Sequence, residues 1–326
     1  MAQKYRKNVP FLSHKSVSIA IVLIAIGSRV LQLIFFFNIR VDGMYQYLAM
    51  KYFTAGHGVS IAEVLPENLS HPVYEPLINW PPGYSILLSP FYVLFNHNYV
   101  AAGLTVDILA ATVLIIFSRK ILRLLEIPIH LVNVYTLFSG FFIYNFYFIA
   151  SSDAIAISIF VIAVHQTMLL LKTNSKWIFR ISLISFILIL CGFIKYLFYP
   201  VVFVIPFFLI AKGLIDKLPH LKKAGYISFT LVAIALASLL LYQKSISGTA
   251  GYISQPERGF FPENLSHAYP FIPGSIINPE SITKVLSSSK TAEANLFSLF
   301  QVVHILSIAA IIICIFLWIR KKGIRK

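Results

Sequence analysis

Two aspartates stand where an apolar chain is expected to leave the lipid bilayer. Asp42 follows the first long apolar stretch, in the run RVDGMYQYLAMKYF, and Asp153 precedes another, in FIASSDAIAISIF. Aspartate side chains are negatively charged in water at neutral pH. A carboxylate in this position can accept a proton from a hydroxyl group, which is general-base catalysis. Either residue could instead be a helix N-cap, because aspartate accepts hydrogen bonds from the first free backbone amides of a helix.

Basic residues are the second set of candidates, because a phosphate group at the membrane surface needs a cation. Lys195 lies between two apolar stretches, in GFIKYLFYP, whereas Arg258 and His267 lie in a long polar segment. Lys195 could also be a lysine whose aliphatic stem lies in lipid while its ammonium group reaches water. His57 and His71 do not match the spacing of a known metal motif. The sequence therefore indicates no metal site and no cofactor, and a divalent cation would be an addition that no motif supports.

One further pair of charges falls inside apolar stretches. Arg29 and Asp107 each lie about eight residues from the outer end of their stretch. Charges within a bilayer are costly unless they pair. We expect a structural ion pair that fixes two helices, and the functional alternative is a proton relay.

Composition determines the class of protein. The chain has 326 residues, of which 58% are hydrophobic and 12% charged, and its mean hydropathy is +0.80. Soluble domains have about 25% charged residues, so a single soluble domain is excluded. The net charge of +15 could suggest nucleic-acid binding. The basic residues lie in short loops between apolar stretches, however, which is the positive-inside pattern of membrane proteins.

Hydropathy predicts an all-α, polytopic fold in one integral membrane domain, residues 1–326. A helix needs about 20 apolar residues to cross the hydrocarbon layer. The segment 81–95 is too short for this and contains Pro81, Pro82 and Pro90, so we expect a helix along the membrane surface that Pro90 interrupts. The predicted spans are 16–37, 99–118, 129–149, 153–172, 178–194, 197–211, 224–242 and 296–319.

Charge predicts the topology of these eight spans. With 81–95 outside the bilayer, the cytoplasmic segments hold 19 Lys and Arg and the outer segments hold 7. The positive-inside rule then places both termini in the cytoplasm. Two long outer segments remain, 38–98 with juxtamembrane helices and 243–295. Both contain the hexapeptide PENLSH, so both could face one cavity.

Aromatic residues are concentrated at the predicted outer boundary. An aromatic belt at the lipid–water interface explains such a concentration. The alternative is the wall of a cavity that binds a lipid tail and a sugar ring. The candidates for this cavity are Tyr45, Trp80, Tyr84 and Tyr196.

The order of these features resembles the GT-C superfamily of membrane glycosyltransferases, in the branch with protein O-mannosyltransferases and the lipid A aminoarabinose transferase. The resemblance covers residues 16–211: Asp42 after the first span, the Pro-rich run NWPPGYSILLSPFYVLF, the basic turn SRKILRLL, and Asp153 at the start of a later span. Some relatives have a lysine just before the juxtamembrane proline, where this chain has Trp80 or Pro81. The phosphate contact is therefore assigned to Lys195 or Arg258.

The resemblance implies transfer of a sugar from a polyprenyl-phosphate donor to a hydroxyl group of a glycolipid, glycan or protein, with inversion. Asp42 would be the base, Asp153 would orient sugar or acceptor, and a cation would stabilise the leaving phosphate. We expect a bacterial cytoplasmic membrane with the active site on its outer face. Two other functions fit the composition. One is a lipid or polysaccharide flippase with Arg29 and Asp107 as its coupling pair, and the other is a non-catalytic assembly subunit.

Overall fold

The computed structural model describes residues 15–36, 39, 41–63, 72–141, 152–173 and 176–248. This part of the chain is mostly helical, and six of its helical segments are long and apolar enough to cross a membrane. They are α1 (Lys15–Phe36), α4 (Tyr99–Leu124), α6 (Ser152–Lys172), α7 (Trp177–Ile194), the consecutive helices α8 (Phe198–Val201) and α9 (Val204–Ile215), and α10 (Pro219–Ser247).

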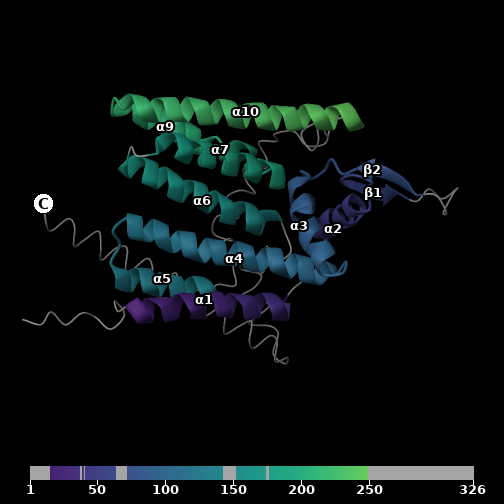
Figure 1. The fold of residues 1–326 in the computed structure, drawn as a ribbon, viewed down its shortest axis with the longest axis horizontal. Helices are drawn as coiled ribbons and strands as arrows, with labels where there is room; N and C mark the ends of the chain where they lie inside the picture. The colour runs from purple at the N-terminus through teal and green to yellow at the C-terminus, as the bar shows by residue number, and fades with distance from the viewer. Residues whose placement is uncertain are drawn as a thin grey trace, which may run out of the picture.

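The long helices form a bundle in which each packs on its neighbours (Figure 1). α4 packs on α1 and on α6, α6 packs on α7, and α10 packs on both α7 and α9. α5 (Ile129–Phe141) packs mainly on α1. The expected span 129–149 begins as predicted, but only its first part lies within the described residues. The expected span 296–319 and the segment 249–295 lie outside them.

One end of the bundle carries the extra elements of the segment 38–98. They are α2 (Val41–Thr54), the antiparallel strands β1 (Ser60–Glu63) and β2 (Val73–Pro76), and α3 (Gly83–Leu94). We call this end the hairpin end. The described part of the chain is mainly helical, as predicted for an all-α membrane protein, and the two short strands are an addition that was not predicted. Sequence analysis did not find them because each strand has only four residues, which is too short for a clear alternating pattern.

α3 confirms that the helix in segment 81–95 is too short to cross the bilayer, but it corrects the prediction that Pro90 interrupts this helix. It has 12 residues, too few to cross the hydrocarbon layer, and it packs on α2 and α4. Pro90 was expected to interrupt the helix, but α3 continues through it to Leu94. Proline removes one backbone donor and strains the preceding turn. Here the surrounding contacts keep the helix intact, since its residues Leu88 and Tyr92 are buried in the core.

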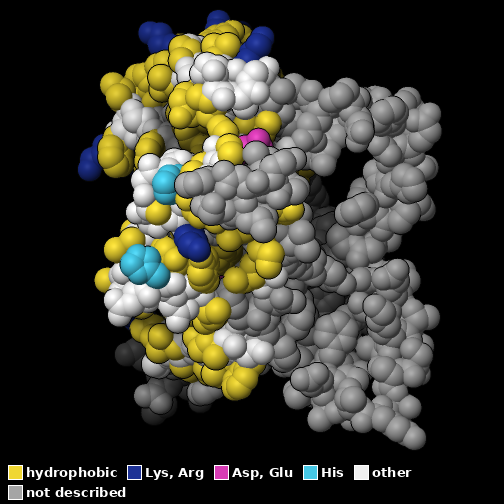
Figure 2. Space-filling model, turned by 90° about the vertical axis from the view of Figure 1, so that its right-hand side faces the viewer, with side chains coloured by type: hydrophobic (Ala, Val, Ile, Leu, Met, Phe, Trp, Pro, Cys, Tyr) yellow, Lys and Arg dark blue, Asp and Glu magenta, His cyan; other side chains and the backbone are white. Residues whose placement is uncertain are grey.

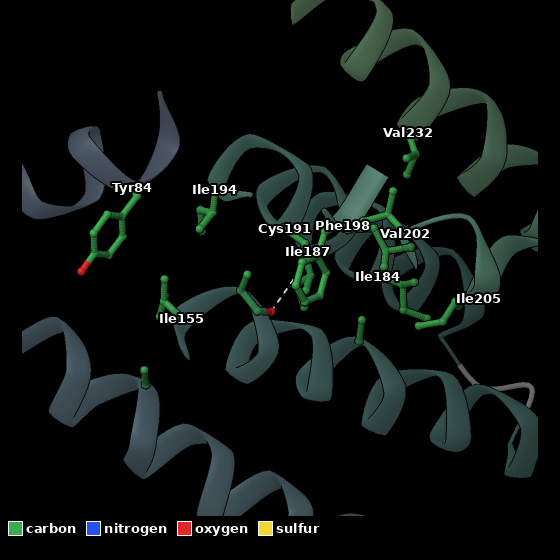
Figure 3. Close-up of a cluster of buried hydrophobic side chains, with 14 of the residues drawn as sticks. Tyr84, Ile155, Ile184, Ile187, Cys191, Ile194, Phe198, Val202, Ile205 and Val232 are labelled. Carbon is green, nitrogen blue, oxygen red and sulfur yellow. Dashed lines mark hydrogen bonds between the residues drawn. The ribbon is translucent and has the colours of Figure 1, made fainter. Parts of the chain in front are cut away.

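The core is a continuous hydrophobic cluster that joins the long helices to α2 and α3. Figure 3 shows a part of it, with Ile187 and Cys191 of α7 beside Phe198 of α8, and with Ile155 of α6 on the side of Ile194. Tyr84 of α3 lies at the edge of this cluster, and its hydroxyl points away from the other labelled side chains (Figure 3). The core therefore fixes the position of α3 relative to the starts and ends of the membrane helices.

The opposite end of the bundle is basic. It comprises the start of α1, the turn from α4 to α5, the turn from α6 to α7, and the turn from α9 to α10, and we call it the basic end (Figure 1). Eleven described Lys and Arg residues lie there, namely Lys15, Arg119, Lys120, Arg123, Lys172, Lys176, Arg180, Lys212, Lys217, Lys222 and Lys223. Three described Lys residues lie at the hairpin end: Lys51, Lys195 and Lys244. Hydrophobic side chains cover most of the described surface there (Figure 2).

Candidate functional site

The hairpin end brings together two charged residues that the sequence had singled out separately. Lys195 Nζ donates a hydrogen bond to Asp153 Oδ2 at 2.9 Å. Asp153 is the second residue of α6, and Lys195 follows the last residue of α7 directly. α6 and α7 are antiparallel and packed, so the start of one lies beside the end of the other.

This ion pair is partly accessible. The side chain of Lys195 is 22% exposed and that of Asp153 is 19% exposed. An ammonium group has three N–H donors, and the Asp153 contact uses one of them. Lys195 can therefore bind a second anion while Asp153 holds its position.

Asp42 lies at the same end, in the first turn of α2. The helix begins at Val41, so Asp42 is the second helical residue and not the flanking N-cap residue that we had considered. Negative charge in the first turn is favourable because of the helix dipole. The structure describes the backbone of Asp42 but not its side chain. Its role as a base remains a prediction. Arg258 and His267 lie wholly outside the described residues.

A pair of tyrosines lies between α2 and α3. The rings of Tyr47 and Tyr84 are 6.2 Å apart in an edge-to-face arrangement, and both side chains are almost completely buried. The two hydroxyls interact, but not with the geometry of a well-formed hydrogen bond, and neither has such a partner among the described residues. A buried polar group without a hydrogen bond costs about 1–3 kcal/mol. The two hydroxyls thus keep hydrogen-bonding capacity that the described residues do not use.

Tyr84 is also held in its neutral form. Burial raises its pKa well above the usual value, and the nearby Tyr47 and the negative charges of Asp107 and Asp153 raise it further. A neutral phenol donates a hydrogen bond to an anion or a sugar oxygen. Tyr84 is therefore a hydrogen-bond donor within electrostatic range of the Asp153–Lys195 pair.

Two further contacts involve predicted cavity residues. Tyr45 stacks on Trp80, with ring centroids 5.4 Å apart and an angle of 18° between the rings. The hydroxyl of Tyr196 donates to the carbonyl oxygen of Ile78 at 2.9 Å and accepts a hydrogen bond from Gln243 of α10. Burial raises the pKa of Tyr196 to about 12, although the hydrogen bond with Gln243 opposes this. All four predicted cavity residues therefore lie at the hairpin end, around α3 and the segment before it.

Arg29 and Asp107 are both buried, at 4% and 3% exposure. Arg29 lies in α1 and Asp107 in α4, which pack together, and the two charges interact electrostatically. Arg29 Nη1 also donates to Gln32 Oε1 at 2.8 Å, and Gln32 in turn donates to the carbonyl oxygen of Gly140 in α5. This network joins three helices, as a structural pair would.

Sequence reasoning missed Tyr47 and Gln243. Tyr47 was noted only as part of the motif around Asp42, and Gln243 was not noted at all. A glutamine in a long apolar helix was the available signal, because a buried amide needs hydrogen-bond partners. Gln243 is 3% exposed, and its Oε1 has no hydrogen-bond partner among the described residues.

Among the described residues, no cluster of three or more His, Cys, Asp or Glu side chains is arranged to bind a metal ion. Comparisons of the chain with protein-family models, curated proteins and solved structures find no match. The resemblance to the GT-C superfamily consequently rests on the motifs of the sequence alone.

Proposed function

We propose that the protein is a membrane glycosyltransferase of the GT-C type. It would transfer a sugar from a polyprenyl-phosphate donor to a hydroxyl group at the outer face of a bacterial cytoplasmic membrane. The observation that carries the proposal is the Asp153–Lys195 pair at the hairpin end, with its 2.9 Å contact and partial exposure. The phenol of Tyr84 lies within electrostatic range of this carboxylate, on α3, which packs on α2, the helix that bears Asp42.

Each residue would have a separate chemical role. Asp42 would remove the proton from the acceptor hydroxyl as its oxygen attacks the anomeric carbon. The bond from that carbon to the phosphate oxygen would break, and the electron pair would leave with the polyprenyl phosphate. Lys195 would stabilise the leaving phosphate, Asp153 would hold Lys195 and orient the sugar, and Tyr84 would donate to a ligand oxygen. A single displacement inverts the anomeric carbon.

The position of the site relative to lipid supports a lipid-linked donor. The sugar–phosphate bond of such a donor lies at the membrane surface, while its tail remains in the hydrocarbon layer. α3 is apolar but too short to span, and the stacked Tyr45 and Trp80 lie close to its start. Aromatic faces bind the apolar faces of sugars and lie readily at the headgroup level.

The test is donor turnover by the full chain purified in detergent. Undecaprenyl-phosphate mannose, glucose and arabinose are supplied with an extract of envelope glycolipids, and mass spectrometry measures loss of the donor and the mass added to the acceptor. We expect the Asp42→Asn variant to bind donor but to turn it over at least 100-fold more slowly, because loss of a general base typically costs 10²–10⁴ in rate. Full turnover by this variant would remove Asp42 from the mechanism.

A flippase would give a different result. It would consume no donor with any of these sugars, but it would move fluorescent polyprenyl phosphate across the membrane of a proteoliposome. The buried charges Arg29 and Asp107 would be needed for that movement, whereas the glycosyltransferase proposal assigns them a structural role.

A further inference from the structure

The basic end contains a pocket that the proposed function does not use. It has a volume of about 460 Å³ and lies between α1, α4 and α6. Its lining consists of three cations, three apolar residues and one histidine: Arg119, Lys120, Arg123, Val22, Ile116, Leu124 and His165. The three cations belong to the last turns of α4, which run away from the hairpin end (Figure 1).

The positive charge of this pocket is not neutralised by its own lining, which has no acidic residue. Arg119 donates to the neutral hydroxyl of Thr136 at 3.0 Å, and the ammonium of Lys120 lies 4.5 Å from the ring centroid of Phe117. The nearby Glu126 contacts Lys172 at 3.5 Å and is 86% exposed. These contacts leave the three positive charges without a carboxylate partner among the described residues.

A second observation concerns His165. Its side chain is only 8% exposed, it packs edge-on against Phe117, and its Nδ1 has no hydrogen-bond partner among the described residues. A buried polar atom of this kind needs a partner. His165 therefore adds an unsatisfied buried nitrogen beside a pocket whose lining carries unbalanced charge.

The two terminal segments of the chain do not offer a complementary charge. Residues 1–14 contain Lys4, Arg6 and Lys7 and no acid, and residues 319–326 contain five Lys and Arg and no acid. Neither terminal segment therefore supplies an anion to the pocket, whereas another molecule can.

The depth of the pocket identifies that molecule's class. His165 lies seven residues before the end of α6, or about 10 Å along the helix, whereas Arg123 and Leu124 lie at the very end of α4. A ligand that fills the pocket must combine a negative group at the surface with an apolar part directed into the bilayer. Basic pockets between membrane helices bind the head groups of anionic lipids.

We propose that this pocket binds the head group of an anionic phospholipid from the leaflet at the basic end. The phosphate would contact Lys120 and Arg123, and the glycerol and first acyl carbons would lie against Val22, Ile116 and Leu124. This proposal does not depend on the enzymatic activity proposed above.

The test uses the full-length protein in a zwitterionic detergent and native mass spectrometry to measure lipid binding. The probes are phosphatidylglycerol, phosphatidylcholine of the same acyl chains, and inorganic phosphate. The variant Lys120→Gln/Arg123→Gln leaves the Arg119–Thr136 hydrogen bond in place. The matched control Lys222→Gln/Lys223→Gln removes the same charge from α10 at the same end, outside the pocket.

We expect phosphatidylglycerol to bind the unaltered protein at least tenfold more tightly than phosphatidylcholine. The pocket variant should bind phosphatidylglycerol about 30-fold more weakly than the unaltered protein does, because each of the two basic residues removed contributes about fivefold to the affinity for an anionic lipid. The control should lose less than threefold, and phosphatidylcholine binding should not change.

Three results would overturn the proposal. The pocket variant could keep the preference for phosphatidylglycerol. The control could lose as much affinity as the pocket variant, which would indicate a general surface charge effect. Inorganic phosphate could compete fully with the lipid at equal concentration, which would indicate a site for a free anion. A variant that melts more than about 5 °C lower is replaced by the single variant Arg123→Gln, for which the expected loss is fivefold.

Discussion

At the level of single residues, the Asp153–Lys195 pair allows structural and chemical roles to be separated. Removing one partner by Asp153→Asn or Lys195→Met should lower the free energy of unfolding by about 1–3 kcal/mol, between the values for exposed and buried pairs. The exchange variant Asp153→Lys/Lys195→Asp restores the pair. We expect it to recover most of the stability but less than about 1% of donor turnover, because the cation then lies on the wrong helix. Recovery of turnover would show that the pair is only structural.

Tyr196 predicts how stability depends on pH. Its pKa is raised to about 12 in the folded protein, against about 10 in an unfolded chain. Between these values the unfolded state binds fewer protons than the folded state, so the free energy of unfolding falls as pH rises. The loss is less than about 1.4 kcal/mol for each pH unit between 10 and 12, because solvent screens this partly exposed side chain. It is small below pH 10 and stops growing above pH 12. Tyr47 and Tyr84 act in the same direction.

The measurement is the unfolding temperature in detergent at pH 9 and at pH 11. The decrease between these two values should be smaller in Tyr196→Phe than in the unaltered protein. Tyr242→Phe, which replaces a tyrosine that is 61% exposed, is the control and should change the decrease little. An equal decrease in both variants would mean that Tyr196 does not contribute.

At the level of elements, the position of α3 depends on a close contact with the end of α7. A Cβ atom on Gly83 would lie 2.5 Å from the carbonyl oxygen of Phe193, two residues before Lys195. Gly83→Ala must therefore push the start of α3 away from α7, at a cost of about 1–3 kcal/mol. We expect lower donor turnover as well, because α3 carries Tyr84 and directly follows Trp80.

The control for this prediction is Gly27→Ala in α1, where a Cβ atom would meet no other atom within 4 Å. Alanine is the better helix former by about 1 kcal/mol, so this variant should be as stable as the original or more so. Unfolding temperature and donor turnover are measured for both variants. Normal stability and turnover in Gly83→Ala would show that the contact between α3 and α7 tolerates a Cβ atom at position 83.

The arrangement of elements explains what the sequence could predict. Hydropathy located the described membrane helices to within a few residues, except that α4 extends to Leu124 and α10 runs from Pro219 to Ser247. The residues by which α4 and α10 exceed the prediction are largely polar. Hydropathy does not mark where a helix stops among polar residues. Asp153 and Lys195 were each predicted as site residues, but not as a pair. α6 and α7 are apolar on all sides, so the pattern does not reveal which faces meet.

At the level of the whole molecule, the uneven distribution of charge predicts an orientation in the membrane. Most described Lys and Arg residues lie at the basic end, and such an excess marks the cytoplasmic side. The hairpin end would then face outward, together with Asp42, Asp153 and Lys195. A donor that is presented at the outer face can reach the site only in this orientation.

Cysteine labelling in intact cells tests the orientation. The native Cys191 and Cys314 are replaced by alanine, and one new cysteine is introduced as Lys51→Cys at the hairpin end or Lys222→Cys at the basic end. A membrane-impermeant maleimide should label Lys51→Cys in intact cells, and Lys222→Cys only after the membrane is opened. Both positions are exposed in the structure, so burial does not explain a missing label. The opposite pattern would place the site in the cytoplasm, where a donor displayed on the outer surface does not reach it, and the proposed function would be wrong.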